Sequence, residues 1–83
     1  MEQKSVAVIV IIVRKPDESA EKVNKILSEN GDIVIARLGV PYPKRELCII
    51  TLVVDGSNDR IGAITGKIGQ IPNVTVKTTF AKL

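Results

Sequence analysis

Few residues of this chain belong to the types that do catalytic or metal chemistry. The sequence contains one cysteine, Cys48, and no histidine. Without histidine, acid–base catalysis would fall to carboxylates or lysines, and a single thiol cannot supply the several thiolates of a structural zinc or iron–sulfur site. Cys48 itself lies in a stretch that reads as a buried strand, where cysteine usually serves as a small apolar residue. We therefore expect no enzyme active site, no metal and no cofactor.

The acidic residues do not form a catalytic constellation either. They gather where helices are expected to begin, as in Asp17 and Glu18 and again in Asp55 and Asp59. Carboxylates at these places stabilise the positive end of the helix dipole. Helix capping is therefore the simplest interpretation of this acidic pattern.

A glycine stripe and one loop aromatic are the stronger candidates for function. At 100° per residue, Gly62, Gly66 and Gly69 gather on one side of a predicted helix, roughly 140° from its isoleucines. Each glycine costs a helix about 1 kcal/mol relative to alanine, so the stripe marks either a close contact or a locally frayed helix. Tyr42 lies in a proline-braced hairpin over residues 39–46, expected at its tip, where it either packs locally or meets a partner.

The pattern of apolar residues predicts the elements that hold these candidates. An unbroken β-branched run predicts a central strand over residues 6–13. A helix is expected from Pro16 to about residue 30, because proline suits the first turn and Gly31 the end. Further strands are expected over residues 33–38, 47–54 and 74–80, with Gly39 and the following prolines ending the first of these. A second helix, capped by Ser57 or Asn58, is expected to run to about residue 71.

The resulting order, βαββαβ, is that of a ferredoxin-like sandwich. This α+β fold has a four-stranded antiparallel sheet with both helices on one face. The fold pattern further implies the strand order 4-1-3-2, and the whole chain, residues 1–83, is expected to be one domain.

Charge and hydropathy limit the partners that the chain can have. The 12 basic and 9 acidic residues are interspersed, and the predicted central strands carry no aromatic residue on which a base could stack, so nucleic-acid binding is not expected. The longest apolar run, residues 6–13, is far short of the ~20 residues that cross a bilayer. We expect a cytoplasmic chain that does not insert into membranes.

The predicted central strands are apolar on both faces. A sheet face that meets water should carry polar residues at every second position, but residues 6–13 are all aliphatic and residues 47–54 include only Thr51 as a polar residue other than Cys48. A second copy of the same sheet is the simplest cover for the face that the helices leave bare. We expect a homodimer or tetramer; the alternative is a monomer with a partly solvated apolar face.

Three segments of the sequence resemble one family of small proteins. Residues 37–42, the Asp55–Gly56 pair with the valines before it, and above all the glycine-rich helix over residues 61–69 are similar to regulators of iron-only hydrogenase systems, a branch of the ACT-like ferredoxin folds. The resemblance implies a small effector bound at a subunit interface near the first strand–helix loop, which here holds Arg14, Lys15 and Asp17. The fold also resembles the C-terminal half of nickel-responsive repressors, but their histidine ligands are absent, so no nickel site is carried over.

Residues and resemblance together favour a regulatory module over an enzyme. The leading hypothesis is a homo-oligomer of an iron-only hydrogenase system that senses a small molecule or docks a partner protein. The alternative is a structural oligomerisation module without a ligand. The candidate ligand or interface residues are Arg14, Lys15, Asp17, Tyr42, Gly62, Gly66 and Gly69.

Overall fold

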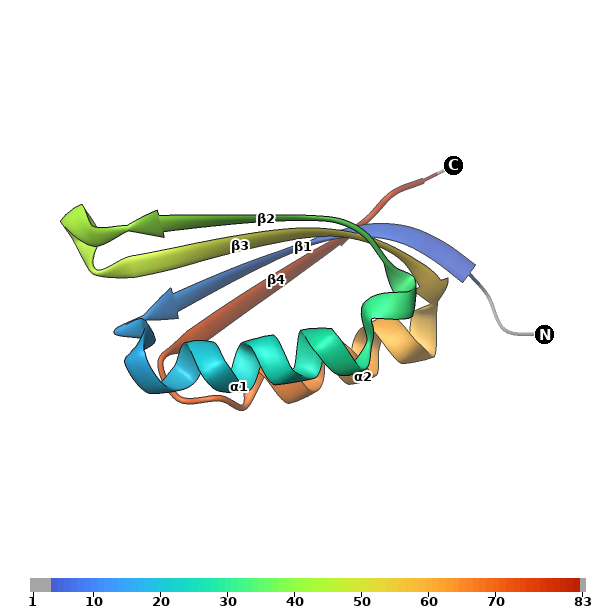
Figure 1. Cartoon of the computed structure of the whole chain (residues 1–83). Coiled ribbons are helices and arrows are strands. Elements are labelled where there is room, and N and C mark those ends of the chain that lie inside the picture. Colours follow the sequence, from blue (N-terminus) through green and yellow to red (C-terminus); the bar gives the residue numbers. More distant parts are fainter. Residues whose placement is uncertain (1–3, 83) are drawn as a thin grey trace.

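One antiparallel sheet carries both helices on a single face (Figure 1). The computed structural model describes residues 4–82, apart from the side chains of residues 16–18. Its elements are β1 (Lys4–Arg14), α1 (Pro16–Glu29), the 3-10 turn η1 (Gly31–Ile33), β2 (Val34–Tyr42), the 3-10 turn η2 (Pro43–Arg45), β3 (Leu47–Ser57), α2 (Asn58–Gly69) and β4 (Val74–Phe80). The strand order β2-β3-β1-β4 confirms the predicted ferredoxin-like sandwich, with β1 and β3 central.

The core lies between the sheet and the two helices. On β1, alternate residues from Ala7 to Val13 are fully buried against the helices, and Ile50, Leu52 and Val54 of β3 lie beside them. The isoleucines of α2, opposite its glycine stripe, face the sheet, because Ile61, Ile64 and Ile68 are all buried. Burial of this aliphatic surface is the main force that holds the helices on the sheet.

Side-chain caps mark the end of α1 and the start of α2. Pro16 occupies the first turn of α1, as predicted, and the Asn30 side chain donates a hydrogen bond of 2.8 Å to the carbonyl of Ile26 at the other end. At α2, the Ser57 hydroxyl accepts a hydrogen bond of 3.1 Å from the backbone N–H of Arg60. Of the two predicted caps, Ser57 is therefore the one used.

The second strand is longer than predicted. Gly39 and Pro41 were expected to end it, but β2 continues to Tyr42 and pairs with β3 throughout, with one bulge at Ile35. Because β2 is an edge strand, a proline there can face outward without removing a hydrogen bond of the ladder. Tyr42 is consequently the last residue of a strand, and the turn itself is η2 followed by Glu46 at φ 54°.

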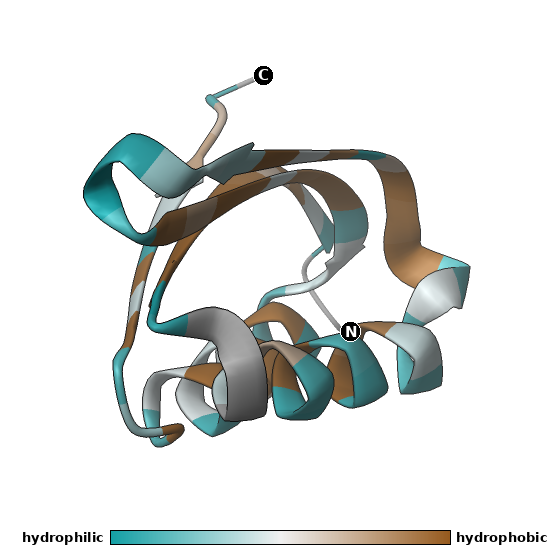
Figure 2. Cartoon of the chain, turned by 60° about the vertical axis from the view of Figure 1, so that its left-hand side comes forward, coloured by the Kyte–Doolittle hydropathy of each residue, from teal (hydrophilic) through white to brown (hydrophobic). Residues whose placement is uncertain are grey.

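The sheet face opposite the helices is uncovered and largely apolar. We call this surface the open face. It is formed by Lys4, Val6, Val8, Val10, Ile12 and Arg14 of β1, Leu47, Ile49, Thr51, Val53 and Asp55 of β3, Ala36, Leu38, Val40 and Tyr42 of β2, and Thr75, Lys77 and Thr79 of β4. Figure 2 shows apolar residues along much of these strands, whereas the outward sides of the helices are mostly polar. Leu38, 62% exposed, and Val40, 40% exposed, are its most accessible large aliphatic residues.

An ion pair ties η1 to the start of α2. The Arg60 guanidinium donates two hydrogen bonds to the Asp32 carboxylate and a third, of 3.3 Å, to the side chain of Asn30. Beneath it, Ile33 packs so closely on Gly56 that a Cβ at Gly56 would lie 3.2 Å from the Ile33 Cγ2. Hydrogen bonding to Arg60 lowers the pKa of Asp32 and raises the pKa of Arg60.

The lowered pKa of Asp32 predicts how its contribution to the stability of the fold depends on pH. A carboxyl whose pKa is lower in the folded state stabilises the fold above its unfolded pKa, and this contribution disappears as pH falls through the folded pKa. Asp32→Asn should therefore be slightly less stable than the wild type at neutral pH, since the pair is exposed. The difference in stability between the variant and the wild type should shrink in acid. Urea midpoints at about pH 7 and about pH 2.5 measure it, and an equal difference at both values would contradict it.

Candidate functional site

A hollow lies where the β2–β3 hairpin meets the β1–α1 junction. In Figure 1 the hairpin projects past the end of the helical layer. The hollow has a volume of about 570 Å³, within the range of small-molecule sites. It is lined by Lys15, Pro41, Tyr42, Pro43, Glu46, Leu47 and Cys48.

Backbone hydrogen bonds hold the β1–α1 junction against the hairpin. Lys15 has a left-handed conformation with φ 52°, and its N–H donates to the carbonyl of Glu46 at 3.2 Å. On the other side, the N–H of Arg14 donates to the carbonyl of Asn73 at 2.8 Å. Lys15 is thereby fixed between two segments that are distant in the sequence, at the entrance to α1.

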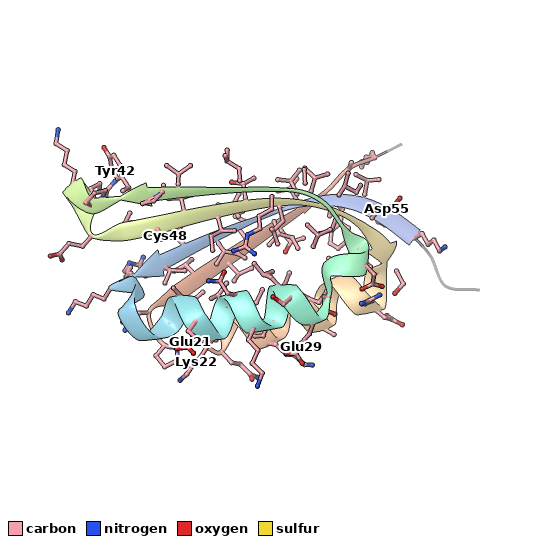
Figure 3. All side chains as sticks on the ribbon, in the orientation of Figure 1. Glu21, Lys22, Glu29, Tyr42, Cys48 and Asp55 are labelled. Carbon is pink, nitrogen blue, oxygen red and sulfur yellow. The ribbon has the colours of Figure 1, made fainter. Side chains whose placement is uncertain are left out.

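The lining of the hollow combines apolar surface with a few different polar groups. Two prolines and Leu47 supply the apolar part, while Lys15 and Glu46 contribute one cationic and one anionic side chain. Tyr42 is 40% exposed and offers its hydroxyl, and Cys48 is only partly buried, contrary to the expected full burial. Figure 3 shows Tyr42 and Cys48 on the same hairpin, toward its projecting end. Such a lining suits a small amphipathic molecule.

Among the described residues, the structure contains neither a metal-ligand cluster nor a helix that could cross a membrane. No group of three or more His, Cys, Asp or Glu side chains comes together in that part of the chain. No described helix is both long and apolar enough for a membrane span.

Of the predicted site residues with described side chains, the fold brings Lys15 and Tyr42 into the hollow. Arg14 belongs to the open face, where its guanidinium donates a hydrogen bond of 3.1 Å to the Thr75 hydroxyl. The side chain of Asp17 lies outside the described part of the structure. The three glycines lie on the exposed side of α2 and do not line the hollow.

Comparison with known families identifies the group to which the chain is related. Residues 5–78 match the profile of the TM1266-like family, described as "Iron-only hydrogenase system regulator, putative". The chain belongs to this family. The resemblance seen in the sequence is thereby confirmed, and the family description concerns regulation rather than catalysis.

Solved structures agree with the membership in the TM1266-like family. The chain is 35% identical to protein TM1266 from Thermotoga maritima, with a TM-score of 0.93 over 96% of this chain and 100% of that one. A functionally unknown protein from Pediococcus pentosaceus shares the fold alone, at 11% identity and a TM-score of 0.59, over 95% of this chain and 94% of that one. No curated protein sequence matches this family member.

Part of the hollow in this TM1266-like chain was not predicted from the sequence. Pro41, Glu46 and Cys48 become its walls only because β2 extends to Tyr42 and pairs with β3. The apolar residues on both sides of the hairpin could have indicated that the two strands continue toward the turn. The Asp32–Arg60 pair, 28 residues apart, carried no signal in the sequence.

The structure sharpens the prediction for the glycine stripe of α2. A Cβ placed on Gly62, Gly66 or Gly69 would meet no atom within 4 Å beyond its chain neighbours and the backbone of its own helix. If nothing else contacts the stripe, Gly62→Ala and Gly66→Ala should each raise the free energy of unfolding by up to about 1 kcal/mol. If a partner packs there, alanine should weaken that association instead. Thermal melts, combined with sedimentation of the double variant, show whether alanine stabilises the helix or weakens an association.

Proposed function

We propose that the chain is a non-catalytic, homo-oligomeric regulatory module of an iron-only hydrogenase system. The family description supplies the regulatory context. The open face is the observation that supports the homo-oligomer. It leaves aliphatic side chains of β1, β3 and β2 uncovered in the isolated chain. A contiguous apolar surface of this kind marks an interaction site in soluble proteins.

A second copy of the same face is the partner that fits best. The open face spans roughly 20 by 30 Å, from the spacing of strands and of residues along them. Its footprint of about 600 Å² is about three-quarters of the roughly 800 Å² per partner that a standard stable interface buries. Two sheets also pack well face to face at about 10 Å, as in β-sandwiches. A homodimer, or a tetramer built from it, would bury this surface.

The regulatory signal enters, in this proposal, through the hollow at the hairpin. Its volume of about 570 Å³ and its mixed lining support a small amphipathic ligand that contacts Lys15. Docking of a partner protein on the projecting hairpin is the second route, since η2 at its tip is exposed beyond the open face. The single unpaired thiol fits the reducing cytoplasm, where we place the module.

Native mass spectrometry of the purified protein tests both parts of the proposal together. We expect a dimer or tetramer that retains a small molecule in substoichiometric or full amount. Lys15→Glu should lose the small molecule but keep the oligomer, while Lys25→Glu, an exposed change elsewhere on α1, should keep both.

Two results would contradict the proposal in different ways. A wild-type protein that sediments as a monomer at micromolar concentration would overturn the homo-oligomer. An oligomer with no retained ligand, and with a melting temperature that Lys15→Glu leaves unchanged, would favour the structural oligomerisation module instead.

A further inference from the structure

We propose that the two copies stack their open faces with strands running in opposite directions, so that Arg14 of each copy pairs with the partner's Asp55. This inference rests on the proposed function, because it requires the open faces to meet. It adds the orientation of the two copies and the charged residues that select it.

The positions of Arg14 and Asp55 have the symmetry that this arrangement needs. In the ladder between β1 and β3, Val10 pairs with Thr51, and this row is the middle of the open face. Arg14 follows Val10 by four residues and Asp55 follows Thr51 by four residues, and the two strands are antiparallel. Each charge therefore lies about 13 Å from the middle row, at opposite ends of the face.

A two-fold axis across the strands at the middle row brings these opposite ends together. The positive end of one copy then lies over the negative end of the other, and this happens twice by symmetry. An axis along the strands would instead place Arg14 near the partner's Arg14 and Asp55 near the partner's Asp55. Because like charges repel and opposite charges attract at these separations, the first orientation is favoured.

The side chains of Arg14 and Asp55 are both placed to contact the facing copy. Arg14 and Asp55 are exposed and belong to the open face by register. The hydrogen bond from the Arg14 guanidinium to Thr75 at 3.1 Å holds it over the sheet. Asp55 forms no salt bridge with any other described residue, and Figure 3 shows it at the end of the sheet away from Tyr42 and the hairpin.

Two further cations of the open face lie at its margins. Lys77 belongs to the middle row but lies on the edge strand β4, where its long side chain reaches water. Lys4 lies at the outer end of β1, beyond Val6, the residue that pairs with Asp55. In the opposed stack the partner's Lys4 lies two residues, about 7 Å, beyond the row of Arg14. Its repulsion of Arg14 is therefore weaker than the attraction within the Arg14–Asp55 pair.

Charge reversal provides a direct test by sedimentation equilibrium of the full chain at low salt. Arg14→Asp and Asp55→Arg should each raise the dimer Kd about 10-fold, because two symmetric attractive pairs become repulsive. The double variant should return to within about 3-fold of the wild type, since both pairs are restored in reverse. Asp59→Arg, an exposed change on α2, should leave the Kd unchanged.

The outcomes distinguish a failure of the opposed orientation from a failure of the dimer itself. A wild-type dimer whose Kd is unchanged by either single reversal, or not restored by the double variant, would overturn the opposed orientation while the dimer itself stands. A monomeric wild type would overturn the dimer. Circular dichroism of each variant confirms that folding is intact, and Arg14→Ala serves as the milder variant if Arg14→Asp does not fold.

Discussion

Ile9→Lys is expected to abolish folding, whereas Val8→Lys, one residue away, should leave a folded chain. Ile9 is completely buried between the sheet and the helices, and its register partners are Leu52 and Thr78. An unpaired charge buried there would cost several kcal/mol. That is comparable with the whole stability of a small domain, about 5–15 kcal/mol.

Val8 provides the matched control for this prediction. It lies on the same strand but belongs to the open face and is 39% exposed, so a lysine there can reach solvent. Both substitutions replace a β-branched strand former with lysine, and the main difference is the face of the sheet to which the side chain points. Far-UV circular dichroism and thermal melting measure the result. A folded Ile9→Lys together with an unfolded Val8→Lys would mean that the helices cover the other face.

Val10→Lys should separate the copies without unfolding them. Val10 lies in the middle row of the open face, beside Thr51, and is partly buried in the isolated chain. At the centre of a sheet-to-sheet interface, two symmetric lysines would be desolvated and would repel each other. We expect the Kd of the dimer to rise at least about 100-fold, as for other interface-centre substitutions, with little change in the circular dichroism spectrum.

A lysine at the margin of the same face controls for the added charge. Thr79 lies on the edge strand β4 and is exposed. Thr79→Lys should therefore raise the Kd only slightly, because the side chain can extend past the rim. Sedimentation equilibrium of both variants makes the comparison. If Val10→Lys dimerises as tightly as the wild type, the copies do not meet through the open face.

The order and type of the main elements could be predicted from the sequence because they depend on local patterns. A few neighbouring residues are enough to predict each element. They are the β-branched run for β1, the isoleucine spacing for α2 and the proline at the start of α1. The order of these elements then implies the ferredoxin-like sheet, since few connections of short elements are sterically and topologically allowed.

The direction of the β1 side chains could not be predicted in the same way. All residues from Val6 to Val13 are aliphatic, so neither set of alternate positions is marked as the core. Only the packing of α1 and α2 decides that Ile9 and Ile11 are buried and that Val8 and Val10 belong to the open face. The same packing determines which substitution breaks the fold and which one tests the assembly.

The hollow also depends on the tertiary structure. The sequence by itself determined a small α+β fold with one cysteine and no histidine, and it singled out Lys15 and Tyr42 for separate reasons. The pairing of β2 with β3 through Pro41, and the hydrogen bond from Lys15 to Glu46, place these two side chains around one hollow with Cys48. The hydrogen bond joins Lys15 to a residue 31 positions later in the chain. The pairing of Pro41 with Cys48 follows from strand register and edge position, which local sequence patterns do not encode.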